Sequence, residues 1–289
     1  MSPAQYAIVD PQCRSRGNVM PTVDSLRALD ITPELASASV RHAASFGVSP
    51  ALHECDNILA YIIEYSESSA AHGPAGGVQE YFESGKTDAM KIEALLKKLG
   101  LSPKSNILEF AAGFGRVTRH LTHCRLTASD IHGEAVHFLS EDIRVKAIPS
   151  ATDPDAFAPD ERFDFIFVLS LFSHLPATLF ERWLARLALT LRPGGYLMFT
   201  THGDFAARKV QAFADALDEE MGFGFLANTD QRDLAPEIYG ASIATSKFVI
   251  ENIYRCTDAR IVSFSPGSWW ALQDEWIIRS PLPVTEADS

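Results

Sequence analysis

The chain lacks most of the features that would set it apart from ordinary globular proteins. Nowhere in its 289 residues do about 18 apolar residues follow one another, which excludes a membrane-spanning helix. The N-terminus has no basic segment followed by an apolar run, so we expect no signal peptide. The cysteines are few and show no Cys-x-x-Cys spacing: Cys13, Cys55, Cys124 and Cys256. Reduced thiols in a cytoplasmic protein are the simplest interpretation.

Basic residues are also scarce, because 25 Lys and Arg stand against 37 Asp and Glu and the formal net charge is −12. Recognition of a nucleic-acid backbone needs clustered positive charge, so we expect neither DNA nor RNA as a partner. The apolar content is 46%, and a chain of this length can bury one large core with a small satellite.

The most informative segment is residues 106–121, in which an apolar strand leads through a loop of small residues into the start of a helix. Glu109 stands near the end of this strand. Small residues let a ligand approach the backbone, and a helix start presents free N–H groups. A carboxylate here would repel a phosphate and suits a ligand that carries a cationic amino group.

This segment resembles motif I of the class I S-adenosylmethionine (SAM)-dependent methyltransferases, Asp/Glu-x-Gly-x-Gly-x-Gly. Ala111 stands in place of the first glycine, while Gly113 and Gly115 match the next two positions. A second short strand, residues 125–130, ends in Asp130, like the acid that holds the ribose hydroxyls of SAM in this family.

Two later segments strengthen the resemblance, which covers roughly residues 80–280. Residues 163–176 resemble the family's fourth strand, which begins with Phe-Asp and is often followed by a histidine. Residues 191–200 resemble its Leu-Lys-Pro-Gly-Gly turn into the fifth strand. Four motifs in this order are far more specific than one glycine-rich loop.

A nicotinamide or flavin Rossmann domain is the competing interpretation, and its fingerprint is Gly-x-Gly-x-x-Gly. Counted from Gly113, the third glycine would fall on Thr118, and counted from Ala111 it would fall on Arg116. Glu109 would also face a pyrophosphate, so we reject the dinucleotide interpretation.

Strand-like and helix-like segments alternate through the core, which predicts parallel strands with helices on both faces. With the resemblance, this gives an α/β, Rossmann-like doubly wound sheet of about seven strands, mostly parallel with an antiparallel edge hairpin. An N-terminal helical extension and a helical insertion after strand five complete the fold. Strands are expected near residues 106–110, 125–130, 144–148, 163–169, 195–201, 260–264 and 274–279. The predicted divisions are a flexible arm (1–20), an N-terminal helical cap (21–100), a SAM-binding core (101–202), a lid and substrate insertion (203–243), the completion of the core sheet (244–281) and a tail (282–289).

The resemblance implies how the cofactor SAM would be held. Glu109 would contact the methionine amino group, with a helix-capping carboxylate as the alternative, and Asp130 would contact the ribose. Backbone approach is expected at Gly113 and Gly115. The remaining cofactor contacts that we assign by resemblance are Ala111, Arg116, Ile131 and Leu169.

Two further cofactor contacts are predicted with structural alternatives beside them. Asp153 is the favoured partner of the adenine, although Asp153-Pro154 is also a good turn initiator. Tyr81 and Gly85 resemble a Tyr-x-x-x-Gly element that closes over SAM, and plain packing is the alternative.

Two histidines follow strand ends where a methyl acceptor would pass, His174 after the fourth strand and His202 after the fifth. A hydroxyl acceptor needs a general base, and histidine serves near neutral pH. Family members with unrelated substrates often carry the first of these, so a loop-fixing role stays open. The other histidines considered are expected on helix surfaces: His120, His123, His132 and His137. No metal site is expected, because His132 and His137 have no third ligand at a suitable spacing.

The sequence thus predicts a SAM-dependent methyltransferase that acts on a hydroxyl group of a small molecule, such as a secondary metabolite or sugar-type compound, with methylation at nitrogen or carbon as an alternative. No membrane partner is expected, and a homodimer is left open. The alternative of a different class is a non-catalytic relative that binds SAM or its product for assembly or sensing. Ala111 is the only hint of a degraded motif.

Overall fold

The computed structural model describes residues 28–227 and 234–282. The chain divides after Ser150 into an N-terminal unit and a C-terminal unit. The predicted arm (1–20) and all of the predicted tail except residue 282 lie outside the described residues. No helix among the described residues combines the length and apolar character that a membrane crossing requires.

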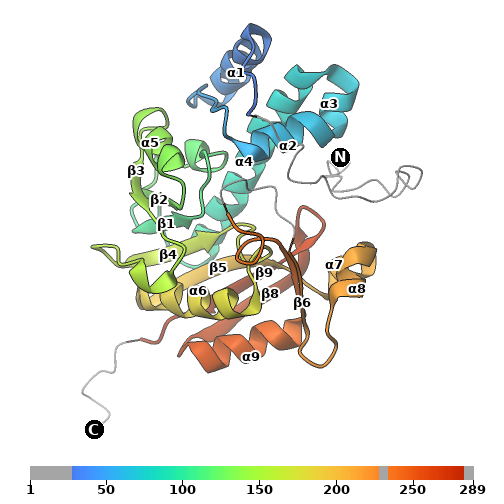
Figure 1. Cartoon of the computed structure of the whole chain (residues 1–289). Helices are drawn as coiled ribbons and strands as arrows, with labels where there is room; N and C mark the ends of the chain where they lie inside the picture. Colours follow the sequence, from blue (N-terminus) through green and yellow to red (C-terminus); the bar gives the residue numbers. More distant parts are fainter. Residues whose placement is uncertain (1–27, 228–233, 283–289) are drawn as a thin grey trace. The chain divides into compact units, whose positions relative to one another are not determined.

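The N-terminal unit begins with the predicted helical extension (Figure 1). Side-chain oxygens of Thr32, Asp56 and Ser66 accept backbone N–H bonds at the starts of the first three helices, as good N-caps do. The apolar faces of the first, second and fourth helices pack around Leu59 and Phe82, which are fully buried. The helices are α1 (Pro33–Phe46), α2 (Asn57–Tyr65), α3 (Glu67–His72) and α4 (Pro74–Lys98).

Three parallel strands follow in the same unit, in the spatial order β3-β2-β1. They are β1 (Ile107–Phe110), β2 (Leu126–Asp130) and β3 (Lys146–Pro149), with helix α5 (Gly133–Glu141) between the last two. Phe110 pairs with Ser129, so the carboxyl ends of β1 and β2 lie at the same edge. This register brings the motif I loop beside Asp130.

The prediction of a helix directly after the motif I loop is wrong, because only a 3-10 turn, η1 (Thr118–His120), follows it. Gly113 and Gly115 have left-handed φ values of +55° and +74°, which no helix interior can accommodate. A helix could begin only after the second glycine, and the chain turns away to reach β2 within a few residues. The predicted free N–H groups of a helix start are therefore replaced by those of an irregular loop.

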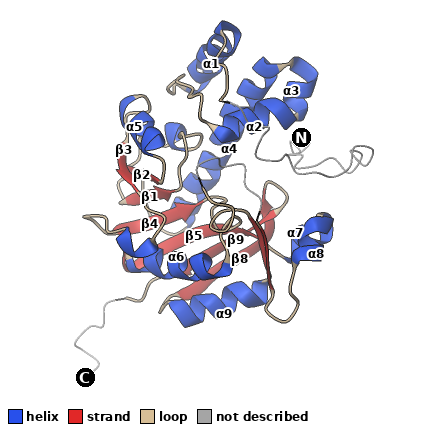
Figure 2. Cartoon of the chain, in the orientation of Figure 1, coloured by secondary structure: helices blue, strands red, loops and turns tan. Residues whose placement is uncertain are grey.

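The C-terminal unit contains four strands in the order β4-β5-β9-β8, in which β4 and β5 are parallel and the other neighbours antiparallel (Figure 2). Helices α6 and α9 pack side by side through Phe180 and Phe248, whose rings lie 5.5 Å apart. The elements are η2 (Pro154–Ala156), β4 (Phe163–Val168), α6 (Ala177–Leu189), β5 (Leu191–His202), α9 (Ser246–Cys256), β8 (Arg260–Trp269) and β9 (Gln273–Arg279).

The insertion after β5 is helical, as predicted, and it also contains a small sheet. The helices are α7 (Asp204–Lys209) and α8 (Gln211–Ala216), and the antiparallel strands are β6 (Phe223–Leu226) and β7 (Ala241–Ala244). Phe213 and Ile243 share one buried cluster, so helix and strand bury a common apolar face.

The predicted fold class is confirmed: counted over both units, seven main strands form an α/β, Rossmann-like fold, mostly parallel with an antiparallel hairpin. Two strands are longer than expected. β5 begins at Leu191, because the predicted Pro-Gly-Gly turn is a bulge within it. β8 runs to Trp269, because only three residues, Trp270 to Leu272, separate it from β9, and the first two have left-handed φ.

His120 was expected on a helix surface and is instead buried at 5% exposure, since the 3-10 turn directs its ring against Phe46 of α1. Burial, together with the charge of Arg119, lowers the pKa of His120 to about 4. His137 is exposed on α5, as predicted. His123 is exposed and pairs with Glu93, but it lies in a turn and not on a helix.

Acid should therefore destabilise the fold in part through His120. The unfolded chain binds this proton near pH 6.5 and the native chain only near pH 4, so the stabilisation is complete above 6.5 and is lost as pH falls toward 4. We expect His120→Phe to remove up to about 1.4 kcal/mol per pH unit from the slope of unfolding free energy across this window. Urea unfolding at several pH values checks this, and equal slopes for variant and wild type would contradict it.

Candidate functional site

Glu109 is buried near the end of β1, beside the motif I loop. The Thr118 hydroxyl donates a hydrogen bond of 2.6 Å to Glu109 Oε2. Burial raises the Glu109 pKa to about 8, against the lowering effects of this bond and of the Arg116 charge. Without a ligand the carboxyl is thus poised to hold or release its proton near neutral pH. An approaching cationic group would favour the ionised form.

The loop after β1 holds three residues in the left-handed region, including Ala111 at φ +61°. The residue that replaces the family's first glycine therefore keeps a glycine-like conformation at a cost in strain. A Cβ added to Gly113 would meet no heavy atom within 4 Å, whereas one added to Gly115 would lie 2.9 Å from Leu139 Cδ2. Space for a ligand is open at Gly113, and Gly115 serves the packing of the loop on α5.

This difference predicts different consequences for the same substitution. Gly113→Ala should lower the stability by no more than roughly 1–2 kcal/mol, the cost of an Ala in the left-handed region. It should weaken SAM binding by about tenfold or more. Gly115→Ala should add an overpacking cost of about 1–3 kcal/mol and destabilise the fold. Calorimetric titration with SAM and thermal unfolding would check both. Unchanged affinity in a folded Gly113→Ala variant would remove the loop from the cofactor site.

Asp130 ends β2 with its carboxylate buried and with hydrogen bonds to both of its oxygens. Its Oδ2 accepts a 2.8 Å bond from the Gly113 N–H, and its Oδ1 accepts one of 3.0 Å from the His132 N–H. The His132 Nδ1 also lies 2.8 Å from Oδ1, so this histidine belongs to the site edge rather than to a helix surface. Ile131, half-buried, connects the two. Asp130 thus fixes Gly113, the loop glycine beside which space is open.

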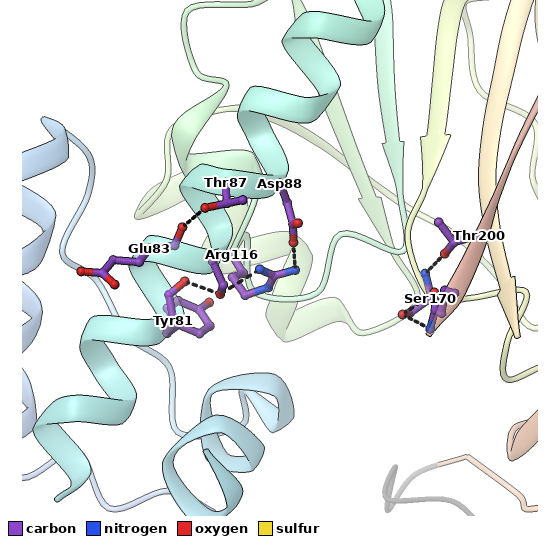
Figure 3. A network of polar contacts seen from close by, with 9 residues as sticks. Tyr81, Glu83, Thr87, Asp88, Arg116, Ser170 and Thr200 are labelled. Atoms are coloured by element: carbon purple, nitrogen blue, oxygen red, sulfur yellow. Dashed lines mark hydrogen bonds and ion pairs between the residues drawn. The ribbon is translucent and has the colours of Figure 1, made fainter. Parts of the chain in front are cut away.

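Tyr81 and Gly85 on α4 make the seam between this helix and the motif I loop. A Cβ on Gly85 would lie 2.3 Å from the Arg116 carbonyl oxygen, so only glycine fits. Figure 3 shows the Arg116 guanidinium turned toward α4, where it bonds to Asp88 at 2.7 Å and to Ser84 at 3.1 Å. The Tyr81 hydroxyl donates to buried Asp56 at 2.6 Å. Packing explains both α4 residues, and their cofactor role stays a prediction.

We expect Asp130→Ala to weaken SAM binding by about 10- to 150-fold, equivalent to roughly 1.5–3 kcal/mol for hydrogen bonds to a charged group. The variant would remove the carboxylate that we predict to accept the ribose hydroxyls, and it would release the Gly113 N–H. Calorimetry on a variant with native circular dichroism provides the measurement. His132→Ala is the matched control, since it removes a neighbour and leaves the carboxylate in place. An Asp130→Ala protein that binds SAM normally would overturn the assignment.

In the C-terminal unit, polar groups gather where β4 and β5 end. Leu169 follows β4, and the next residue, Ser170, has a left-handed φ of +63°. The Ser170 N–H donates to Thr200 Oγ1 at 2.9 Å (Figure 3), which fixes this turn against β5. Gln273, at the start of β9, donates from Nε2 to Ser170 Oγ at 2.9 Å.

His174 and His202 lie in this unit with ring centroids 6.4 Å apart. The His174 Nδ1 lies 2.6 Å from the Gly240 carbonyl oxygen, so Nδ1 carries the proton and Nε2 keeps a lone pair. Among the described residues, the structure shows none that forms a hydrogen bond with this Nε2. The His174 ring stacks on the Tyr239 ring, with the centroids 4.9 Å apart and an interplanar angle of 7°. Burial lowers the His174 pKa.

His202 is committed on both nitrogens. Its Nδ1 donates to the Ser242 carbonyl at 3.2 Å, and its Nε2 accepts from the Gln273 amide at 3.3 Å. Burial, with a smaller effect of His174, lowers the His202 pKa to about 3. Of the two predicted base candidates, only His174 presents an available basic nitrogen.

Asp153 caps the 3-10 turn η2, where its side chain accepts the Asp155 N–H at 3.1 Å. It also forms an ion pair with Arg182 of α6, and both side chains are exposed. The turn-initiating role that the sequence left open is the one that the structure displays. The adenine contact stays a prediction.

The comparisons with known proteins concern the family and the fold. Residues 85–237, just over half of the chain, match the methyltransferase-domain family. The magnesium protoporphyrin IX methyltransferase ChlM of Synechocystis PCC 6803, solved with bound SAH, is similar at a TM-score of 0.50 and 13% identity, over 70% of this chain and 87% of that one. At that identity the likeness supports the fold alone.

Two other solved structures are similar at lower scores. A SAM-dependent methyltransferase of Methanosarcina mazei has a TM-score of 0.49 and 15% identity, over 65% of this chain and 97% of that one. The N-methyltransferase NodS of Bradyrhizobium japonicum WM9 has a TM-score of 0.45 and 18% identity, over 70% and 88%. No curated protein sequence matches the chain.

Proposed function

We propose, starting from the fact that this chain belongs to the methyltransferase-domain family, that it methylates a hydroxyl group of a small molecule. The chain is a SAM-dependent methyltransferase, and the acceptor atom and the base are what we infer. The observation that carries the proposal is the His174 imidazole, held in one tautomer by the Gly240 carbonyl with Nε2 available.

The residues of the N-terminal unit fit the cofactor. Open space lies over Gly113, and the Asp130 carboxylate beside it can accept hydrogen bonds from hydroxyl groups. Glu109, with its raised pKa, suits a cationic amino group, because the ion pair would offset the desolvation of the carboxylate. When bound, SAM supplies an electrophilic methyl group on a sulfonium.

The work left to the protein is positioning and proton removal. A hydroxyl oxygen becomes a good nucleophile only as its proton leaves. His174 Nε2 would accept that proton as the oxygen takes the methyl group, and the imidazolium would then release the proton to water. The lowered pKa keeps His174 neutral, and thus competent as a base, at neutral pH. The parallel Tyr239 ring fixes the plane of the imidazole.

Incubation with SAM labelled in the methyl group, against matched panels of phenols, sugar alcohols and amines, tests the proposal. We expect label in O-methyl products, identified by mass spectrometry. The rate should rise with pH below about 6.5, the ordinary histidine value, and level off by neutrality. Products methylated only at nitrogen or carbon, or a rate independent of pH from 5 to 8, would refute hydroxyl methylation with a histidine base.

A further inference from the structure

A second cluster of reactive side chains lies in the N-terminal unit, apart from the glycines of the motif I loop. His53 and Cys55 belong to the segment that joins α1 to α2, and Glu134 belongs to the first turn of α5. One ligand atom from each side chain lies within 4.8 Å of the others. Spacing in the sequence does not reveal the cluster, because Glu134 is far from the other two along the chain.

The three donors are an imidazole nitrogen, a thiol sulfur and a carboxylate oxygen. Zinc binds all three types, at about 2.0–2.3 Å. Calcium and magnesium are disfavoured, since they prefer oxygen ligands throughout and the cluster offers one carboxylate. A thiolate and a carboxylate would also balance the double positive charge of the ion.

The histidine of this cluster is already oriented. Its ring stacks on Phe114 at 4.4 Å and 18°, and it meets Phe138 edge-on at 5.4 Å. Apolar surroundings of this kind hold a ligand in place and lower the local dielectric. The Cys55 N–H donates to His53 Nδ1 at 3.1 Å, and metal binding would replace this bond.

The other two side chains can complete the geometry. Cys55 and Glu134 are exposed, so rotation about their side-chain bonds is unhindered by a packed core. Donor atoms around a tetrahedral zinc are about 3.5 Å apart, given the bond lengths above. Since the donor atoms lie within 4.8 Å of one another, each pair needs to close by at most about 1.3 Å to reach that spacing.

We propose that His53, Cys55 and Glu134 bind one zinc ion, with water as the fourth ligand. The thiol releases its proton to solvent when the metal binds, so affinity rises with pH. The ion would tie the segment between α1 and α2 to α5. Arg119 holds the same segment, through the carbonyls of Ser49 and Ala51. The site is thus a clamp on the segment that supports the motif I loop.

Cobalt titration of the chelator-treated full chain tests this site directly. We expect one equivalent of Co²⁺ to give a thiolate-to-cobalt charge-transfer band, which Zn²⁺ then abolishes. Cys55→Ser should lose the band. The matched controls keep it, since each replaces a cysteine outside the cluster: Cys13→Ser, Cys124→Ser and Cys256→Ser.

Glu134→Gln and His53→Ala should weaken Zn²⁺ binding in competition with a chromogenic chelator by at least about tenfold, the smaller cost seen for outer partners of a metal. His137→Ala, on the exposed surface of the same helix, should bind as wild type does. Circular dichroism of each variant establishes that the fold persists. Absence of the band in the wild-type protein, its survival in Cys55→Ser, or wild-type affinity in Glu134→Gln and His53→Ala would each overturn the proposal.

Discussion

Arg119→Met should destabilise the N-terminal unit by roughly 3–5 kcal/mol, the range for breaking a buried charged network. The Arg119 side chain is 1% exposed. Its guanidinium donates to four carbonyl oxygens at 3.0–3.2 Å, those of Gly115, Ser49, Ala51 and Phe114. Met would fill much of the volume but would leave the carbonyls of Ser49, Ala51 and Phe114 without this donor, at about 1–3 kcal/mol for each unsatisfied group. The Gly115 carbonyl would keep its bond from the Arg119 backbone N–H.

Another positively charged side chain cannot fully replace Arg119. The guanidinium lies over the rings of Tyr81 and Phe82 at 5.3 and 5.1 Å, so its planar shape is used as well as its donors. Burial raises the pKa of Asp56, and Arg119 is one of the groups that lower it. Arg119→Lys keeps the charge and loses the fork of donors, so we expect a stability between those of wild type and Arg119→Met.

Urea unfolding followed by circular dichroism provides the measurement. Arg41→Met, at an exposed position on α1, is the matched control and should change the unfolding free energy by less than about 0.5 kcal/mol. A wild-type midpoint in Arg119→Met would mean that water or a shifted chain satisfies the three carbonyls that lose their donor. SAM binding should fall with stability, since two of the four carbonyls that the Arg119 side chain contacts belong to the motif I loop.

Arg119 also shows what the sequence could not predict. The strands around motif I were found because apolar runs ending in Glu109 and Asp130 have a local signature. The partners of Arg119 are backbone carbonyls, two of them in a segment far earlier in the chain, and no side-chain pattern encodes them. The missing helix after the loop is a second example, because the chain reaches β2 within a few residues of Gly115 and has room only for the 3-10 turn.

In the candidate site, too, some contacts follow from the sequence pattern and others depend on packing. Asp130 meets the loop because the parallel strands β1 and β2 end together, and it accepts a bond from the Gly113 N–H. The different roles of Gly113 and Gly115 depend on how α5 packs, which local sequence does not specify. His174 and His202 were equal candidates by position, and only their hydrogen-bond partners separate them.

The different hydrogen-bond partners of His174 and His202 lead to the second prediction with a large effect. His174→Gln should lower turnover by about 10²–10⁴, the range for loss of a general base, with SAM affinity unchanged within about twofold. Glutamine can still donate to the Gly240 carbonyl, so the loop keeps its anchor while the basic nitrogen is lost. The acid limb of the pH–rate profile should disappear in the variant, because it reports ionisation of this group.

His202→Gln is the matched comparison, since His202 is buried nearby and both its nitrogens are occupied by Ser242 and Gln273. We expect it to lower stability and to reduce turnover of the folded fraction by less than about tenfold, with the acid limb retained. Single-turnover rates from pH 5 to 8 separate the two variants. If His202→Gln lost the limb and His174→Gln kept it, the occupied histidine would be the base, and its bond to Gln273 would have to open during catalysis. If both variants stayed active with a flat profile, proximity alone would account for the rate, as expected for an acceptor that needs no proton removed.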